Sequence, residues 1–399
     1  MAKNTTFNFP WREDNNFELL VDGSRFYPIM LDAIRSSRQF VLLEMYLFNS
    51  GKVADSFIEV LIEAANRGVM VYLLLDDFGA MGLVKKDRTR IIQSGIHLNF
   101  YNPLHYGELR RNLFRNHRKL LVSDYQVAFV GGAGITDEFN PLTVGKRAWH
   151  EVMIQITGPN VMDWCEVFKK TWEQWARQSL TLPPQRTLVA AGIQAGHVAV
   201  SGRFGSPEIQ RAFVKRIHAS ERRVWMATAY FVPSWKLRRA LRFAAHHNVD
   251  VRLLLPGAYT DHPAVRHAGR RFYTRLLRAG VRIFEYQPRF LHAKVLLCDD
   301  WVSIGSSNVD RWNLRWNLEG NQEVEDSHFA DRVQALLQND FLQSEEYLLD
   351  VWLKRSWYSR LQEWFWGNVD VWLERIGWAI KYRNYRNSKK TDHDTNSRD

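Results

Sequence analysis

The sequence predicts an α/β fold made of two tandem α/β/α domains related by a pseudo-twofold axis. Two observations support this prediction. Strand-like and helix-like segments alternate along the chain, which is typical of a mainly parallel or mixed sheet. Four strand-like segments also recur in the same order, between 175 and 185 residues apart. A chain of 399 residues is long enough for two such domains, each with a substantial core.

The repeated segments are short, apolar and rich in residues that favour strands. SSRQFVLLEMYLF (36–48) resembles ASERRVWMATAYF (219–231), with Tyr46 opposite Tyr230. The other pairs are 67–77 with 247–257, 94–103 with 279–288, and 116–124 with 291–299. A single pair could be a chance similarity between two buried strands, but four pairs in one order indicate a duplication.

Helical patterns separate the strand-like segments. They cover 54–67, 235–247 and 264–279, where apolar residues recur with helical spacing. The stretch 183–200 is rich in small residues and proline, so we interpret it as the connector between the halves. The expected domains are a first half at 1–182, the connector at 183–200, a second half at 201–347 and a C-terminal segment at 348–399.

The composition limits the classes of partner and argues against a disulfide framework, a zinc site and a membrane-spanning segment. A formal net charge of +11 favours nucleic acid, acidic lipid surfaces or phosphorylated substrates, without choosing among them. The two cysteines, Cys165 and Cys298, have no paired spacing, which argues against a disulfide framework or a zinc site. No segment has the pattern of a signal peptide, and no apolar run of about 18 residues predicts a transmembrane helix.

One motif, HxKxxxxD, occurs twice. Its copies are His117/Lys119/Asp124 and His292/Lys294/Asp299. A His and a Lys two positions apart on a strand project from the same face. One HxK usually marks a solvated strand edge, but two copies, each followed by Asp and a glycine-rich turn, are a strong signal. Two lysines can neutralise phosphoryl oxygens, one imidazole can attack phosphorus, and the other can transfer protons. The motifs therefore predict one phosphodiester-processing site.

The motifs resemble those of the phospholipase D superfamily, in which HxKxxxxD is followed by GSxN. The second copy continues with Ser306 and Asn308, whereas the first has Gly132 and Gly134 at these positions. The resemblance implies two phospholipase D-like halves, a catalytic role for both His/Lys pairs, and no metal or other cofactor. It also assigns substrate binding to Ser306, Asn308 and Gly132, and structural roles to Asp124 and Asp299.

The resemblance further implies a carboxylate that orients each histidine. Glu319 matches this position in the second half, and Glu151 matches it in the first half, where the family usually has Asp. Such a carboxylate would bond Nδ1, orient the ring and support the imidazolium. The alternative for Glu151 is an ordinary residue of a surface strand.

Within the superfamily, the chain resembles bacterial cardiolipin synthases from Trp11-Arg12-Glu13 to about residue 345. The segments that carry this resemblance are LLLDDFGAMG, LFRNHRKLLVSD, VAFVGGAGI and WHEVMIQITGP. Without apparent N-terminal spans, the chain is similar to the shorter, B-type enzymes. The resemblance implies that one phospholipid donates a phosphatidyl group to a histidine, and that a glycerol hydroxyl of phosphatidylglycerol accepts it. By family order His117 is the nucleophile and His292 the general acid and base, although the residues alone leave these roles interchangeable.

Two further segments fit a lipid surface. Residues 351–380 hold six of the chain's 16 tryptophans, apolar residues from Trp357 to Ile380 recur in this segment with helical spacing, and the basic cluster 381–390 follows. An amphipathic helix beside such a cluster can lie on an anionic bilayer, but it can also pack on its own domain or form a dimer contact. The stretch 107–116 mixes arginines with apolar residues, and it is either a loop that reaches lipid headgroups or a plain surface loop.

The resemblance therefore implies phospholipid substrates, an anionic membrane surface as partner and no nucleic acid. It places the protein peripherally on the cytoplasmic face of the bacterial inner membrane, and nothing indicates its oligomeric state. Two alternatives stay open. One is a hydrolase or nuclease of the same superfamily, which the positive charge would suit equally well. The other is a non-catalytic membrane-binding relative.

Overall fold

The computed structural model describes residues 7–104, 111–176, 179–184, 190–201, 208–310 and 316–355. The predicted Trp-rich helix and basic tail lie outside these residues from position 356 onward. Residues 107–110 of the arginine-rich loop also lie outside them. Among the described residues, no helix is long and apolar enough to cross a membrane.

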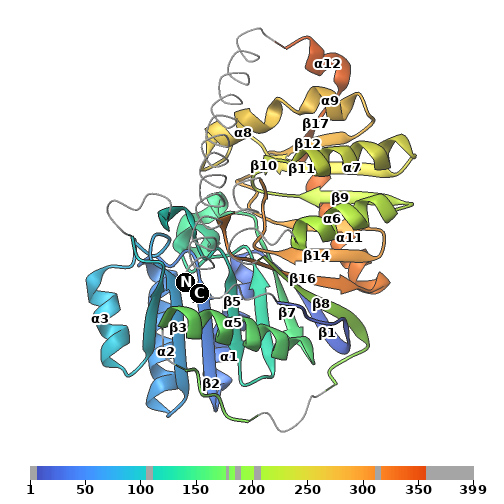
Figure 1. Ribbon diagram of the computed structural model, residues 1–399. Helices are drawn as coiled ribbons and strands as arrows, with labels where there is room; N and C mark the ends of the chain where they lie inside the picture. The colour runs from blue at the N-terminus through green and yellow to red at the C-terminus, as the bar shows by residue number, and fades with distance from the viewer. Residues whose placement is uncertain are drawn as a thin grey trace, which may run out of the picture.

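Within the described residues, the first half has seven strands, and its helices follow the predicted alternation (Figure 1). The strands are β1 (Arg12–Val21), β2 (Phe40–Met45), β3 (Met70–Asp76), β4 (His97–Tyr101), β5 (Lys119–Ser123), β6 (Val127–Gly131) and β7 (Val152–Thr157). The helices are α1 (Gly23–Ser36), α2 (Lys52–Asn66), α3 (Lys85–Gln93), α4 (Pro141–Val144) and α5 (Asn160–Ala176), with 3₁₀ turns at Arg111–Leu113, Asp137–Phe139 and Gly145–Arg147.

The second half repeats this order. Its strands are β8 (Gln194–Ser201), β9 (Arg223–Ala227), β10 (Phe231–Val232), β11 (Asp250–Pro256), β12 (Arg282–Tyr286), β13 (Val295–Cys298), β14 (Trp301–Gly305), β15 (Val309–Asp310), β16 (Glu319–Glu325) and β17 (Ser344–Tyr347). Its helices are α6 (Glu208–Ala219), α7 (Trp235–His246), α8 (Pro263–Arg270), α9 (Tyr273–Leu277), α11 (Ser327–Leu342) and α12 (Leu349–Leu353). The helical stretch predicted at 264–279 is therefore two short helices.

The strand order shows the pseudo-twofold relation directly. One sheet runs β17-β12-β11-β9-β13-β14-β16-β8-β1-β7-β6-β5-β2-β3-β4. From the centre outward, β8-β16-β14-β13-β9-β11-β12 mirrors β1-β7-β6-β5-β2-β3-β4, and β17 is an addition at one edge. The halves join where β1 pairs antiparallel with β8. The prediction of two α/β halves related by a pseudo-twofold axis is therefore confirmed.

The predicted connector contains part of this junction. The range 183–200 includes β8 from Gln194 onward, and β8 pairs with β16 from Ala195 to Ser201. The second half therefore begins before residue 201. Small residues such as Ala195, Gly196 and Ala199 look like a linker in the sequence, yet Val198 and Val200 are buried in the sheet.

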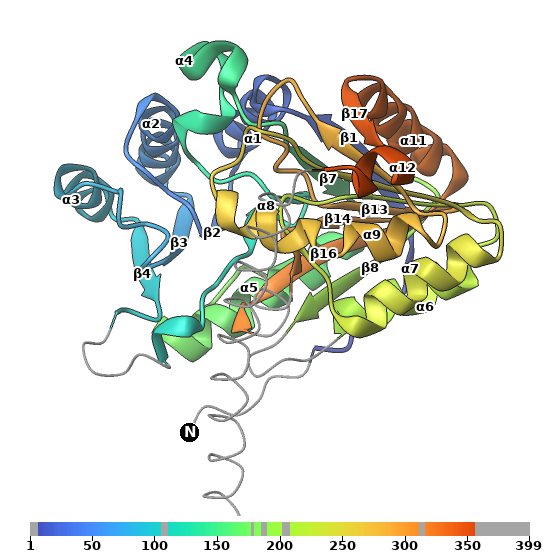
Figure 2. The ribbon, with the colours of Figure 1, turned by 90° about the horizontal axis from the view of Figure 1, so that it is seen from above.

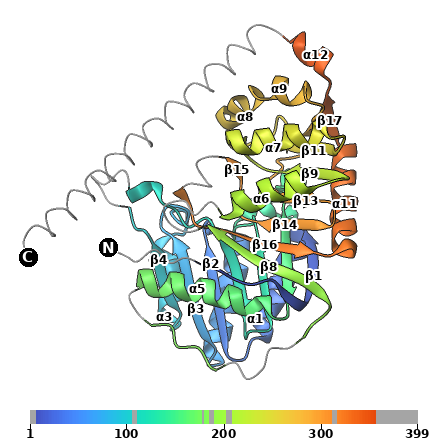
Figure 3. The ribbon, with the colours of Figure 1, turned by 45° about the vertical axis from the view of Figure 1, so that its right-hand side comes forward.

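Helices cover both faces of the sheet in each half. Figure 2 shows α1 and α2 on one side of the first half and α5 on the other, whereas α6 and α7 of the second half lie opposite α11. The faces of α5 and α11 meet in one central cluster, to which Trp164 and Phe329 belong. Figure 3 shows α11 along the outer side of the second half. A core shared in this way holds the two halves in one fixed arrangement.

Candidate active site

Each HxK motif precedes a strand of its own half and contacts a segment of the other half. The N–H of His117 donates to the carbonyl of Leu318, 2.9 Å away. The N–H of His292 donates to the carbonyl of His150 at 2.8 Å. Backbone hydrogen bonds between the halves therefore hold both histidines at their shared boundary, as the pseudo-twofold prediction requires.

The two carboxylates contact the histidines crosswise. Nδ1 of His117 lies 3.2 Å from Oε2 of Glu319, which belongs to the second half. Nδ1 of His292 lies 2.5 Å from Oε2 of Glu151, which belongs to the first half. Both carboxylates are fully buried. Glu151 is therefore not a residue of a surface strand, and each histidine needs the other half to be oriented.

Both lysines are buried beside these pairs. Lys119 donates from Nζ to the carbonyl of His117 at 2.6 Å. Burial lowers the pKa of Lys119 to about 7, although Glu319 acts in the opposite direction. Lys294 lies with Nζ 3.3 Å from Oε2 of Glu151, and burial lowers its pKa as well. Two buried ammonium groups with depressed pKa values favour an anionic ligand at this site.

Burial also governs the histidines. It lowers the pKa of His117 below 6.5, with Glu319 raising it and Lys119 lowering it. The pKa of His292 is lowered well below 6.5 by burial and then by Lys294 and Lys119. Both imidazoles are therefore neutral at pH 7 in the free protein. A carboxylate at Nδ1 favours the tautomer that carries its proton there, which leaves a lone pair on Nε2.

The two copies differ next to their carboxylates, and the structure gives the reason. Oγ of Ser306 donates to Oε2 of Glu319 at 2.5 Å. At Gly132 a Cβ atom would lie 2.2 Å from Oε2 of Glu151. Glu151 is one methylene longer than the Asp usual at its position, and it fills the space that a serine would take. A glutamate at position 151 therefore requires a glycine at position 132.

Asn308 lies two residues after Ser306, and its buried side-chain amide has no hydrogen-bond partner among the described residues. The same holds, within this part of the chain, for Oγ of Ser307. Buried polar atoms without a partner are costly. Such a residue favours a site that a polar ligand completes.

Two tyrosines belong to the site, although the sequence assigned them no role there. The ring of Tyr46 lies 4.7 Å from that of His117, and the ring of Tyr230 lies 6.5 Å from that of His292. Burial raises the pKa of Tyr46 to about 12 and also raises that of Tyr230, so both keep their O–H. Their equivalence in the aligned repeats was the signal that could have identified them.

His292 has a more aromatic environment than His117. Its ring contacts Trp149, Phe139 and Phe290, with centroid distances of 5.1, 5.4 and 5.6 Å. These apolar neighbours add to the burial that keeps His292 neutral. The site is thus asymmetric in its rings as well as in its Ser and Gly positions.

Buried hydrogen bonds fix the two chain neighbours of His117, Asn116 and Arg118. Asp76 accepts the N–H of Asn116 at 2.8 Å, and Asn116 donates from Nδ2 to Oε1 of Glu44 at 2.6 Å. Arg118 donates from Nε to the backbone carbonyl of Glu319 at 3.2 Å. The residues on either side of His117 are therefore fixed to both halves.

His150 supports His292 in a comparable way. Its Nδ1 lies 2.8 Å from Asp22 of the first half, and its Nε2 lies 3.1 Å from Asp340 of the second half. Although burial opposes it, these two carboxylates raise the pKa of His150 to about 9. A charged His150 therefore bridges the halves directly beside Glu151.

Asp124 and Asp299 lie away from this cluster and make backbone contacts. Asp124 accepts the N–H groups of Arg38, Gln39 and Phe40 at 2.7, 2.9 and 2.8 Å. Asp299 accepts those of Glu221, Arg222 and Arg223 at 2.8, 3.0 and 2.9 Å. Both residues have positive φ, 53° and 51°, in the turn after their strand. Their carboxylates thus fix the start of β2 and β9.

We expect Asp124→Ala to lower the free energy of unfolding by roughly 2–4 kcal/mol, because three N–H groups lose a charged acceptor. Asp299→Ala should show the same direction. Asp300→Ala is the matched control, since Asp300 pairs with Arg222 at the surface and its loss should cost less than about 1 kcal/mol. Urea unfolding measures all three. An Asp124 variant as stable as the control would contradict the structural role.

Known proteins resemble the chain over most of its length. The family model described as "Cardiolipin synthase, PLD-like domain" matches residues 30–172 and 213–341. Cardiolipin synthase A of Pseudomonas aeruginosa is 35% identical over 345 residues, which cover 85% of this chain and 69% of that protein. Cardiolipin synthase B of Salmonella typhi is 32% identical over 366 residues, which cover 88% of this chain and 86% of that one.

Solved structures agree with the fold. A phosphatidylserine synthase of Haemophilus influenzae superposes with a TM-score of 0.64 at 12% identity, covering 92% of this chain and 94% of that chain. A polyphosphate kinase of Porphyromonas gingivalis gives 0.57 at 14% identity, covering 84% and 49%. At such low identity these likenesses show the fold alone. The matched family model and the curated relatives go further: the chain belongs to the cardiolipin synthase family of phospholipase D-like proteins.

Proposed function

We propose that this protein is a phosphatidyltransferase that makes cardiolipin from phosphatidylglycerol, or from a second phospholipid donor, through a phosphohistidine intermediate. One observation carries the proposal most. Each of two neutral histidines is held at Nδ1 by a buried carboxylate of the other half, which leaves the lone pair of Nε2 for the chemistry. This is the arrangement that in-line transfer of one phosphoryl group between two alcohols requires.

In the first step, Nε2 of His117 attacks the phosphorus of the donor. A P–N bond forms, and the bond between phosphorus and the headgroup oxygen breaks. His292 gives its proton to that oxygen, and the headgroup leaves as an alcohol. Although the pKa of His292 is low in the free protein, the bound anionic phosphodiester raises it, because a nearby negative charge favours the imidazolium.

In the second step, a glycerol hydroxyl of phosphatidylglycerol enters. His292 takes its proton, the oxygen attacks phosphorus, and the P–N bond to His117 breaks. The products are cardiolipin and a restored pair of histidines. If phosphatidylglycerol is also the donor, the alcohol released in the first step is glycerol.

The remaining site residues hold the phosphoryl group in this proposal. Lys119 and Lys294 face the negative charge that develops on its oxygens. The amide of Asn308 supplies the partner-free polar group that a phosphate oxygen can meet. Ser306 acts through Glu319, to which its hydroxyl is bonded, while Gly132 leaves room for Glu151.

Binding of a phosphate to the free protein is expected to take up protons near pH 8. The pKa of Lys119 is about 7, so most of this amine is neutral at pH 8, and a bound anion raises its pKa. Affinity for inorganic phosphate should therefore fall as pH rises above about 7. Calorimetry in buffers of different ionisation enthalpy measures the uptake, which should shrink in Lys119→Met. Equal uptake in this variant and the parent protein would contradict the assignment.

A product assay tests the proposed reaction. Purified protein receives phosphatidylglycerol vesicles, phosphatidylethanolamine vesicles with glycerol, or single-stranded DNA, and mass spectrometry identifies the products. Cardiolipin with release of glycerol is the expected result. Phosphatidic acid alone would indicate a hydrolase, and cut DNA without lipid products would indicate a nuclease; either would overturn the proposal.

We also place the reaction at an anionic membrane surface, on the cytoplasmic face of the inner membrane. The net charge of +11 supports this attraction. In our proposal residues 356–390 anchor the chain to that surface, whereas Trp352 before them is buried against Tyr273 of the domain. A chain that ends at Arg355 should sediment less with anionic liposomes than the full chain does. Undiminished sedimentation would refute the anchor.

A further inference from the structure

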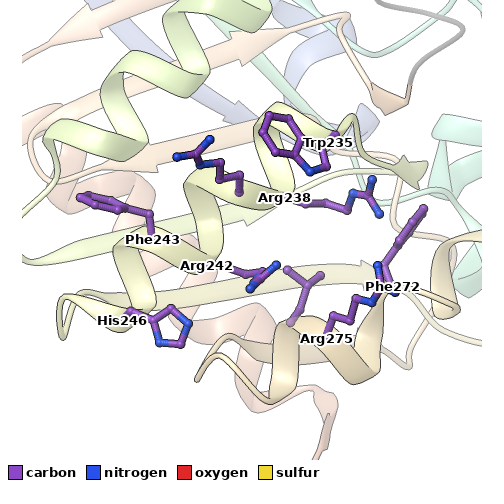
Figure 4. Close-up of a pocket in the computed structure, with 9 residues that line it drawn as sticks. Trp235, Arg238, Arg242, Phe243, His246, Phe272 and Arg275 are labelled. Carbon is purple, nitrogen blue, oxygen red and sulfur yellow. The ribbon is translucent and has the colours of Figure 1, made fainter.

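A basic pocket lies on the helical layer of the second half, apart from the two histidines. It has a volume of about 360 Å³ and lies between α7 and the segment that contains Phe272 and α9 (Figure 4). Arg238, Arg239 and Arg242 of α7 line it together with Arg275 of α9. None of the described residues that line it is acidic. This volume is in the range of pockets that hold small ligands.

Two of the pocket arginines, Arg242 and Arg275, differ from the arginines of the neighbouring α8 and β12. Arg266 and Arg270 of α8 both bond the buried Glu285, and Arg282 bonds Glu346. Among the described residues, neither Arg242 nor Arg275 forms an ion pair or a side-chain hydrogen bond. Their guanidinium groups are therefore available for an anion from outside the protein.

The duplication offers an internal comparison for this charge. In the first half, α2 occupies the place that α7 has in the second half, as the repeat order shows. The outer face of α2 is acidic, with Asp55, Glu59 and Glu63. The fold therefore does not require a basic helix here. Like charges one turn apart, such as those of Arg238 and Arg242, also oppose helix formation, so the cluster has a cost that a bound anion offsets.

Aromatic side chains line the rim of the same pocket. Trp235 is 62% exposed and Phe243 is 41% exposed, which is unusual for rings of their size. The guanidinium of Arg239 lies 5.4 Å above the ring of Trp235, and that of Arg238 lies 4.4 Å above Phe272. Exposed rings beside cations are typical of a surface that meets the headgroup layer of a bilayer.

The chain also connects this pocket to the active site. The ring of Tyr230 contacts His292, and the chain continues through β10 to Trp235 at the start of α7. Gly269 at the end of α8 packs against the carbonyl of Phe231 in β10. A lipid held between α7 and α9 would therefore place the membrane on the half of the molecule that carries His292.

We propose that this pocket binds the phosphate of an anionic phospholipid headgroup, separately from the reacting phosphates, and so docks the second half on the bilayer. The inference rests on the proposed function only in taking a membrane as the place of action. Arginine suits this ligand because its planar fork can bond two phosphate oxygens at once. The arginines supply charge, while Trp235 and Phe243 supply the apolar contact.

The direct test uses the full chain and vesicles with a photoreactive phosphatidylglycerol whose headgroup carries the crosslinker. Mass spectrometry should find label on peptides of α7 and α9, and the Arg242→Gln/Arg275→Gln variant should lose it. A photoreactive phosphatidylcholine should label these peptides far less. Equal labelling by both lipids, or label that never reaches α7 or α9, would overturn the proposal.

Vesicle partitioning supplies a second measurement with a matched control. Arg242→Gln/Arg275→Gln should weaken partitioning to phosphatidylglycerol-containing vesicles roughly 10- to 30-fold, since each basic residue near the surface contributes by its attraction. Lys85→Gln/Lys86→Gln removes the same charge from exposed positions at the start of α3 and should change it by less than about 2-fold. Equal losses in both variants would mean that only total charge matters, and the pocket would be excluded.

Two competition experiments distinguish a lipid headgroup in the pocket from free phosphate and from nucleic acid. Inorganic phosphate should not displace the protein from vesicles if the pocket holds a lipid headgroup at the membrane; full displacement would indicate a site for free phosphate. An oligonucleotide that binds the parent protein but not the pocket variant, with vesicle binding unchanged, would indicate nucleic acid instead.

Turnover of a monomeric short-chain phosphatidylglycerol should be unchanged in the Arg242→Gln/Arg275→Gln variant. Loss of that turnover would contradict a role in docking alone, and no turnover even in the parent protein would refute only the proposed function.

Discussion

His117→Ala and His292→Ala should each lower kcat/KM for phosphatidyl transfer by at least about 10³-fold, while the protein stays folded. The two imidazoles have different tasks in the proposed reaction, and neither can replace the other. Without His117 no nucleophile reaches phosphorus. Without His292 the leaving oxygen lacks a proton donor and the incoming hydroxyl lacks a base.

The matched control is His328→Ala, because His328 is exposed at the start of α11. It should keep activity within about 2-fold of the parent protein, as surface substitutions usually do. Thermal unfolding would show that all three variants are folded. Residual activity within about 10-fold of the parent in either active-site variant would contradict the two-histidine mechanism. A parent protein without activity would favour a non-catalytic relative.

Glu319→Gln and Glu151→Gln should each lower activity by about 10²- to 10⁴-fold, the range seen when an orienting carboxylate loses its charge. The amide fits the same space but no longer stabilises the imidazolium or enforces the Nδ1 proton. The crosswise contacts also predict which histidine each substitution affects: Glu319 orients His117, and Glu151 orients His292.

A donor with a p-nitrophenyl headgroup can distinguish the loss of the nucleophile His117 from the loss of the general acid His292. Such a leaving group needs no proton donor, so one burst of p-nitrophenol reports attack by His117 alone. His292→Ala and Glu151→Gln should keep the burst and then stall, whereas His117→Ala and Glu319→Gln should lose it. A burst that survives in Glu319→Gln but disappears in Glu151→Gln would show that the crosswise assignment is wrong.

The sequence was sufficient for the fold because the duplication repeats its apolar segments in order. Buried strands such as β2 and β9 have continuous apolar runs, and amphipathic helices follow them, so the α/β halves are readable locally. The junction was harder. β8 has small residues and glycine that look like a connector, and only its pairing with β1 and β16 makes it a strand.

The sequence identified the residues of the site, but it could not predict which of them contact one another. The spacing of HxK indicated the chemistry, yet no spacing along the chain shows that Glu151 meets His292 and Glu319 meets His117. That pairing depends on how the halves face each other. The glycine at position 132 looked like a weakened motif until its contact with Glu151 explained it. His150 lies within WHEVMIQITGP, but nothing in that segment indicates that its ring meets carboxylates of both halves.

The most direct test of the central claim is to trap the covalent intermediate and locate it. The protein is mixed with a donor other than phosphatidylglycerol, such as phosphatidylethanolamine labelled at phosphorus, so that no glycerol acceptor is present. The mixture is quenched in alkali, in which phosphohistidine survives. Peptide mapping should place the phosphoryl group on His117, and the label should vanish when phosphatidylglycerol is added before the quench. Label on His292 would reverse the assigned roles, and turnover without a labelled histidine would contradict the account.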